Sequence, residues 1–211
     1  MKRTVKESAG ALTVMAPLRL EARSIRKGAP GIHVVRTGMG PARSSRAARR
    51  LRDDPAHFLV VAGLCGAVDP SLAAGDVVVA SELRRVGAPP HPTESARMCR
   101  VLEARGIRAR LGCALSVDHL VRGAERRVLH AEGAAIVDME SAWLAEAAVG
   151  RPLSVVRVVV DAPGRGFHPL SIVRDGWRAL ALLRKLAPAL ESWASLACDA
   201  AGGGLPSRLG R

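Results

Sequence analysis

The chain has few aromatic side chains and no long apolar run. Its 211 residues include two Phe, three Trp and no Tyr, which excludes the rows of stacking aromatics on which most single-stranded nucleic-acid platforms depend. A membrane-spanning helix needs roughly 18 consecutive apolar residues, whereas the apolar stretch from Ala9 to Met15 is short and is followed by Pro17. We therefore predict a first strand there rather than a signal peptide, and a cytoplasmic protein.

The four cysteines also lack the spacing of a metal site. Cys65, Cys99, Cys113 and Cys198 form no CxxC pair and have no His at metal-site spacing. Such cysteines are typical of free, partly buried thiols. The sequence implies no metal.

What the chain has in abundance is aliphatic residues and positive charge. Hydrophobic residues make up 48% of the sequence, enough for one domain with a sizeable core built from Val, Leu, Ala and Ile. We predict that residues 1–200 form this domain and that 201–211 form a flexible tail. The formal net charge of +13 favours a polyanionic partner. Because the arginines are spread along the whole chain, we expect a generally basic surface, with an anionic membrane surface as an alternative partner and nucleic acid as an unlikely one.

Apolar runs alternate with amphipathic stretches along the chain, which predicts an α/β sandwich around a central sheet. The predicted strands cover residues 12–16, 31–36, 58–62, 77–80, 111–117, 135–138 and 153–160. The predicted helices begin near residue 18 and cover 42–51, 93–103, 123–131, 141–148 and 168–197. We expect the last helix to be bent or broken near Pro188.

Two consecutive predicted strands each end in acidic residues. The first is followed by Asp138 and Glu140, and the second by Asp161. Because sites of α/β proteins often lie at the carboxyl ends of strands, where the next helix starts, a shared pocket is one interpretation. The alternative is that Asp138 or Glu140 only stabilises the N-terminus of the next helix electrostatically.

Glycines mark two further candidate positions. A strand, Gly38-x-Gly40 and a helix carrying Arg43 can receive an anion such as phosphate at free backbone N–H groups. Tight-turn geometry explains the same glycines, since neither a dinucleotide fingerprint nor a P-loop is present. Gly63, next to Leu64 at the end of a core strand, allows a ligand or a neighbouring strand to approach the backbone closely.

Several stretches together resemble the nucleoside phosphorylase and nucleosidase superfamily. In order, they are Thr37–Gly40, Gly63–Pro70 with Gly75–Val79, Val137–Ala142 and Arg157–Asp161. The closest resemblance is to the methylthioadenosine/S-adenosylhomocysteine nucleosidase branch. Within it, the segment Leu20–Arg23 and the short length are similar to hopanoid-associated phosphorylases, which act on adenosylhopane. The resemblance implies a three-layer α/β/α sandwich around a mixed sheet and an enzyme that releases adenine from a 5′-substituted adenosine.

The resemblance also implies a role for each site residue. Asp161 matches the acid that hydrogen-bonds the purine and delivers a proton to N7, for which it must hold or share that proton. Glu140, with Met139 beside it, matches the position that accepts hydrogen bonds from the ribose hydroxyls. Glu21 matches the carboxylate that activates water, and Arg157 matches the arginine that orients it.

Other implied positions concern the base and the nucleophile. His119, with Leu120 next to it, lies where the family often has an aromatic over the base. Leu64 stands where many relatives have a hydroxyl near the nucleophile, and Val160 replaces a common Ser before the acid. The sequence therefore leaves water and inorganic phosphate open as nucleophiles. No organic cofactor is implied, relatives commonly form homodimers, and a hopanoid substrate implies transient contact with the inner membrane.

Overall fold

The computed structural model describes residues 12–163 and 169–200. The strands in that part of the chain are β1 (Leu12–Ala16), β2 (His33–Arg36), β3 (Phe58–Ala67), β4 (Val77–Arg84), β5 (His91–Pro92), β6 (Ala109–Ser116), β7 (Ala134–Asp138) and β8 (Leu153–Asp161). The helices are α2 (Arg19–Gly28), α3 (Pro41–Leu51), α4 (Ser95–Glu103), α5 (Ala124–Ala131), α6 (Ser141–Leu144), the 3₁₀ turn η1 (Ala145–Ala147) and α7 (Pro169–Ala200). The predicted tail at 201–211 lies outside the described residues.

The strands form one mixed sheet in which part of the hydrogen-bond pattern closes on itself. Along the sheet the order is β2-β1-β3-β7-β6-β4-β5, and β8 pairs with both β3 and β4. Strands β3, β8, β4, β6 and β7 therefore form a hydrogen-bonded ring. The mixed sheet confirms the predicted fold class.

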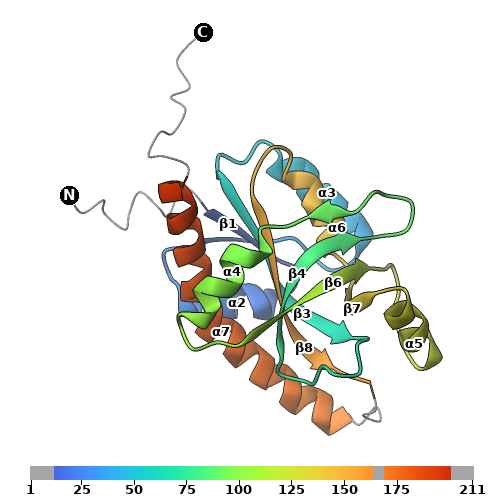
Figure 1. The fold of residues 1–211 in the computed structure, drawn as a ribbon. Helices are drawn as coiled ribbons and strands as arrows, with labels where there is room; N and C mark the ends of the chain where they lie inside the picture. The colour runs from blue at the N-terminus through green and yellow to red at the C-terminus, as the bar shows by residue number, and fades with distance from the viewer. Residues whose placement is uncertain (1–11, 164–168, 201–211) are drawn as a thin grey trace.

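Helices cover two faces of this sheet (Figure 1). On one face α7 packs against α2 and α4, and on the other α3 packs against α6 and η1. The alternation of side chains along each strand explains both layers. In β8, Val156 and Val158 point into the first core, while Val155 and Val159 point into the second. Each central strand is buried on both faces, which is why it reads as a continuous apolar run.

The long helix α7 continues through Pro188 as a single helix. Of the expected bend or break, the break is therefore wrong, and the bend stays a prediction. A proline at this position cannot donate a hydrogen bond to the carbonyl of Arg184, one turn earlier. That carbonyl oxygen faces Gly28 at the end of α2, where an added Cβ would lie 2.0 Å from it. Gly28 thus lets α2 lie directly against the turn that the proline leaves open. Within the described residues, no helix is long and apolar enough to cross a membrane.

The two acid-ended strands are not parallel neighbours. Strand β7 runs antiparallel to β3, whereas β8 runs parallel to it. The carboxyl ends of β7 and β8 therefore point in opposite directions. Because of this arrangement, the acids at the end of β7, Asp138 and Glu140, pair with Arg157 in the middle of β8.

Candidate active site

Glu21 is a buried carboxylate held by backbone N–H groups from the segment before α2 and from strand β3. It lies in the first turn of α2, is 1% exposed, and accepts hydrogen bonds from the N–H groups of Leu18 at 2.6 Å and Leu64 at 2.7 Å. Burial raises the pKa of Glu21, and the nearby Arg157 and the two N–H donors offset only part of this effect. A carboxylate with a raised pKa is a stronger base once it is ionised.

Gly63 makes this position of Glu21 sterically feasible. A Cβ added to Gly63 would lie 2.7 Å from Glu21 Oε1 and 2.8 Å from Arg157 Nη1. Any side chain at Gly63 would therefore push the carboxylate or the guanidinium away. The predicted close approach to this glycine is made by Glu21 and Arg157 themselves.

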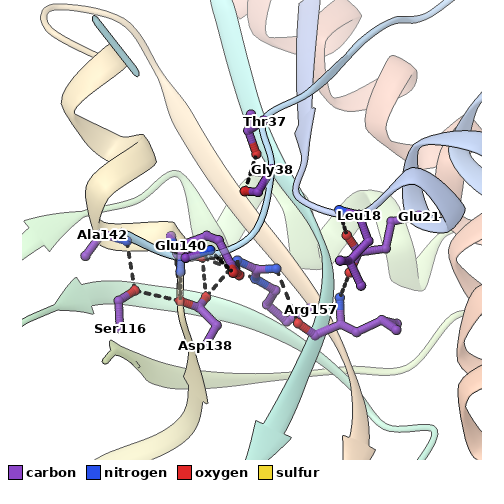
Figure 2. A network of polar contacts seen from close by, with 12 residues as sticks. Leu18, Glu21, Thr37, Gly38, Ser116, Asp138, Glu140, Ala142 and Arg157 are labelled. Carbon is purple, nitrogen blue, oxygen red and sulfur yellow. Dashed lines mark hydrogen bonds and ion pairs between the residues drawn. The ribbon is translucent and has the colours of Figure 1, made fainter. Parts of the chain in front are cut away.

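Arg157 is the centre of the polar network (Figure 2). It is fully buried in the middle of β8. Its Nη2 lies 2.8 Å from Asp138 Oδ2 and 3.7 Å from Glu140 Oε2. Its Nη1 donates to the carbonyl of Leu64 at 3.3 Å, and the N–H of that same residue binds Glu21. Leu64 thus contributes through its backbone, which needs no hydroxyl side chain.

Asp138 is the structural partner in this network. Its Oδ1 accepts hydrogen bonds from the N–H groups of Glu140 and Ser141 at 3.0 Å each, where α6 begins. Oδ1 also accepts from the hydroxyl of Ser116 at 2.6 Å, and Oδ2 accepts from the hydroxyl of Ser141. The alternative of a carboxylate that stabilises a helix N-terminus therefore describes Asp138.

Glu140 lies between this network and the loop after β2. It is 5% exposed, and Oε1 accepts a hydrogen bond from the N–H of Gly40 at 3.0 Å. Burial raises the pKa of Glu140; Arg157 lowers it in part, while Asp138 adds to the increase. Met139, beside it, is half-buried.

The predicted anion cradle is already hydrogen-bonded within the chain. The N–H of Gly38 donates to the carbonyl of Pro17 at 3.2 Å, and the N–H of Gly40 donates to Glu140. Both glycines have a positive φ, 87° and 89°, as tight turns require. Arg43 is exposed and donates to the carbonyl of Met39 at 3.3 Å.

Asp161 lies apart from the other three predicted catalytic and ribose-binding residues. It ends β8, four residues after Arg157, which corresponds to roughly 13 Å along a strand. Its Oδ2 is ion-paired and hydrogen-bonded to Nη2 of Arg126 from α5. A cavity of about 690 Å³ borders both residues. The structure thus brings Glu21, Glu140 and Arg157 together and places Asp161 further along β8, beside a cavity that none of these three residues lines.

His119 is bound to acidic neighbours on the surface. Its Nδ1 lies 2.8 Å from Asp118 Oδ1 and its Nε2 lies 2.6 Å from Glu125 Oε1. The hydrogen bonds to these two carboxylates raise the pKa of His119. Leu120, next to it, is 58% exposed. Stacking of His119 on a base stays a prediction.

Sequence reasoning missed two groups that the structure adds to the site. The first is the pair of serines, Ser116 and Ser141, which bind Asp138 and, from Ser141, also Arg157 at 2.8 Å. The second is Arg126, the partner of Asp161. Ser141 lies only three residues from Asp138, but the contacts Ser116–Asp138, Ser141–Arg157 and Arg126–Asp161 join residues 22, 16 and 35 positions apart, which no local sequence signal marks.

Comparison with known proteins decides the family. The model of the phosphorylase superfamily matches residues 20–177. The chain belongs to the phosphorylase superfamily. That match contains every residue of the buried network, from Glu21 to Arg157. No curated protein sequence matches this superfamily member significantly.

Solved structures support the same fold at low identity. A mutant of the Helicobacter pylori nucleosidase MTAN, with 5′-methylthioadenosine in its active site, is 17% identical, with a TM-score of 0.75 over 88% of this chain and 98% of that one. A mutant of H. pylori futalosine hydrolase is also 17% identical, with a TM-score of 0.75 over 86% and 98% of the two chains. A putative nucleosidase from Borrelia burgdorferi, bound to adenine, is 15% identical, with a TM-score of 0.73 over 85% and 98%. At this identity the likeness concerns the fold of this phosphorylase-superfamily chain.

Proposed function

We propose that this protein is an enzyme that cleaves the N-glycosidic bond of a 5′-substituted adenosine and releases adenine. The observation that carries the proposal is the charge of the buried network, in which one guanidinium, Arg157, faces three carboxylates, Glu21, Asp138 and Glu140. Such a site favours the positive charge that develops on the sugar as the bond to the base breaks. A neutral or anionic intermediate would gain nothing from this excess of carboxylates.

The proposed reaction uses one carboxylate for each task. The C1′–N9 bond breaks and its electron pair goes to the base, which gains a proton at N7 through Asp161. Glu140 accepts hydrogen bonds from the 2′- and 3′-hydroxyls. A water molecule attacks C1′ and gives its proton to Glu21, whose raised pKa suits a general base. Overall, one proton is taken from solvent and one is returned to it.

Water is the nucleophile that we favour over phosphate. The N–H groups of Gly38 and Gly40 are engaged with Pro17 and Glu140, and the side chain of Leu64 offers no hydroxyl. Glu21 supplies the base that water needs, whereas phosphate is already an anion and needs none. Phosphorolysis stays the alternative, because Arg43 is exposed next to this loop.

We propose adenosylhopane as the substrate, with methylthioadenosine or S-adenosylhomocysteine as the alternative. The support is three exposed apolar side chains close in the chain to residues of the network: Leu18, Leu20 and Met39, which are 37%, 50% and 52% exposed. The hydrogen bond from Gly38 to Pro17 joins the segment before α2 to the loop after β2. Exposed apolar side chains suit a hydrophobic 5′ substituent, whereas a methylthio group needs only a small closed slot.

The deciding experiment is product analysis by mass spectrometry. The purified protein is incubated with adenosylhopane and, separately, with methylthioadenosine, each with and without phosphate. We expect adenine and a free ribosyl product in both buffers. A ribosyl-1-phosphate that forms only with phosphate would establish phosphorolysis instead. Release of adenine from neither substrate would favour a basic, non-catalytic nucleotide-binding protein.

We further propose that the enzyme works in the cytoplasm as a homodimer that docks transiently on the inner membrane. The support is the resemblance to hopanoid-associated phosphorylases and the exposed Arg19, Arg23 and Arg43, which lie close in the chain to the exposed apolar residues Leu18, Leu20 and Met39. Basic side chains near an anionic leaflet contribute about 1 kcal/mol each. Flotation with vesicles is expected to increase with anionic lipid content, and no such dependence would contradict docking. Analytical ultracentrifugation tests the dimer.

A further inference from the structure

The hydroxyl of Ser141 lies between Arg157 and Asp138 in the buried network. Ser141 begins α6, and its side chain is fully buried. Its Oγ accepts hydrogen bonds from Arg157 Nη2 at 2.8 Å and from Arg157 Nε at 3.2 Å. A guanidinium only donates, so the single hydroxyl proton goes to Asp138 Oδ2, which accepts it. These three hydrogen bonds use the donor and both lone pairs of the hydroxyl.

The backbone places Ser141 independently of the guanidinium. Its N–H donates to Asp138 Oδ1 at 3.0 Å, and helix α6 packs against α3. The position of the hydroxyl is therefore set by the start of α6. Arg157, which extends from the middle of β8, takes the orientation of its guanidinium from this fixed acceptor.

The other edge of the same guanidinium lies on the side of Glu21. Arg157 Nη1 donates to the carbonyl of Leu64 at 3.3 Å, and the N–H of Leu64 donates to Glu21 Oε1 at 2.7 Å. A Cβ added to Gly63 would lie 2.7 Å from Glu21 Oε1 and 2.8 Å from Arg157 Nη1, so both groups approach the same point. Figure 2 shows Arg157 between the acids at the end of β7 and Glu21. Because the guanidinium is planar and rigid, fixing Nε and Nη2 also fixes Nη1.

We propose that Ser141 is a positioning residue, whose hydroxyl holds Arg157 so that Nη1 faces the side of Glu21 on which the nucleophilic water is activated. This inference rests on the proposed function, since it takes Glu21 as the general base. Asp138 meets the guanidinium at Nη2, and a contact at one nitrogen lets the plane turn. Ser141 adds Nε as a second fixed point on the same edge.

Two serine variants separate this role from simple support of Asp138. Ser141→Ala removes the contacts with Arg157 together with one hydrogen bond to Asp138. Ser116→Ala removes a hydrogen bond to the same carboxylate, of 2.6 Å, and one from the N–H of Ala142. Both serines are buried, so thermal melting should show similar decreases in Tm. The kinetic readout is adenine release from whichever of adenosylhopane and methylthioadenosine the unmodified protein cleaves.

The expected kinetic effects differ between the two variants. Ser141→Ala should lower kcat about 10-fold and keep KM within about threefold, because a turned guanidinium misplaces the water rather than the bound nucleoside. Ser116→Ala should lower kcat by no more than about threefold, because its contacts are with Asp138 and the backbone. Ser141→Thr keeps a hydroxyl and is expected to restore most of kcat.

The acid limb of the kcat/KM profile is a readout that a loss of stability does not move. Burial raises the pKa of Glu21; of the charged groups that face it, Arg157 lowers this pKa and Glu140 raises it. When Arg157 turns away in Ser141→Ala, the pKa of Glu21 rises further. A base must be ionised, so kcat/KM should begin to fall at a higher pH than in the unmodified protein. Ser116→Ala should keep the unmodified profile.

Each outcome decides for or against the positioning role. Equal losses of kcat in Ser141→Ala and Ser116→Ala, or an acid limb that stays in place, would overturn the inference and leave Ser141 as a support of Asp138. If Ser141→Ala does not fold, Ser141→Cys replaces it, since a thiol has a similar size but forms only weak hydrogen bonds. Ser141→Cys should then lose kcat where Ser141→Thr keeps it, and equal values would contradict the role. No adenine release by the unmodified protein would instead refute the proposed function, and the positioning role with it.

Discussion

Replacing the central arginine of the network tests the structural argument most directly. In Arg157→Met the side chain keeps an unbranched apolar stem but loses the charged guanidinium, which leaves Asp138, 1% exposed in its side chain, without an ionic partner. Breaking a buried ion pair in this way costs about 3–5 kcal/mol. Because Asp138 keeps its bonds from Ser116 and from the N–H groups of Glu140 and Ser141, we expect the lower part of that range, about 3–4 kcal/mol. For a chain of this size, that lowers Tm by about 6–16 °C.

The pH dependence of this decrease in Tm identifies its cause. Burial on its own would raise the pKa of Asp138, but Arg157 and the hydrogen bonds from Ser116 and Ser141 outweigh it and lower the pKa. A lowered carboxylate pKa gives stability that is present above the unfolded value, about 3.9, and is lost as the pH falls through the folded value. Without the guanidinium, burial raises the pKa of Asp138 instead. Protonation of Asp138 then removes the cost of burying an unpaired negative charge. The Tm difference between the two proteins should therefore shrink as the pH is lowered from 7 towards about 4.

The control for this measurement is Arg151→Met. Within the described part of the chain, Arg151 donates only to backbone carbonyls, among them those of Asp54 and Ala56. Arg151→Met therefore leaves no carboxylate without an ionic partner, and its effect on Tm should be independent of pH. Thermal melts followed by circular dichroism measure both variants. A Tm of Arg157→Met within about 2 °C of the unmodified protein at pH 7, or a loss that stays constant on acidification, would refute the reasoning.

Further predictions concern catalysis and are checked by steady-state kinetics. Asp161→Asn should leave binding of the nucleoside largely intact and lower kcat by about 10²- to 10⁴-fold, and an unaffected rate would remove its assigned role. Glu140→Ala should weaken both binding and rate, whereas normal kinetics would show that the sugar lies elsewhere. Because burial raises the pKa of Glu21 and a base must be ionised, kcat/KM should fall on acidification well before the ordinary value of 4.5, and a profile flat down to that pH would contradict the assignment. Gly63→Ala places a methyl group 2.7 Å from the Glu21 carboxylate and should cost about 10²-fold in rate, while Gly176→Ala, in open space, should cost nothing.

Some residues of the buried network could be predicted from the sequence alone. Glu21, Glu140 and Arg157 were predicted from the resemblance of short motifs, and the structure brings all three together around one guanidinium. The sequence allows two interpretations of Asp138, and the hydrogen bonds that it accepts at the start of α6 favour the structural one. Ser116 could not be predicted, because its contact with Asp138 depends on the register between β6 and β7.

The expectation of one pocket shared by both acidic strand ends stays a prediction. The direction of the two strands is what local sequence patterns do not supply. Strand β7 enters the sheet antiparallel to β3, at Gly66 and Ala67. Its acids therefore meet Arg157, while Asp161 meets Arg126.

The sequence by itself determined the alternation of strands and helices, the aliphatic core and the acidic ends of two strands. These features follow from periodicity and composition, which each segment carries locally. Only the tertiary structure decided the direction of β7, the unbroken path of α7 past Pro188 and the pairing of Arg126 with Asp161. Each of these depends on contacts between segments far apart in the chain, where hydrogen-bond register and close packing choose among arrangements that local periodicity leaves equivalent.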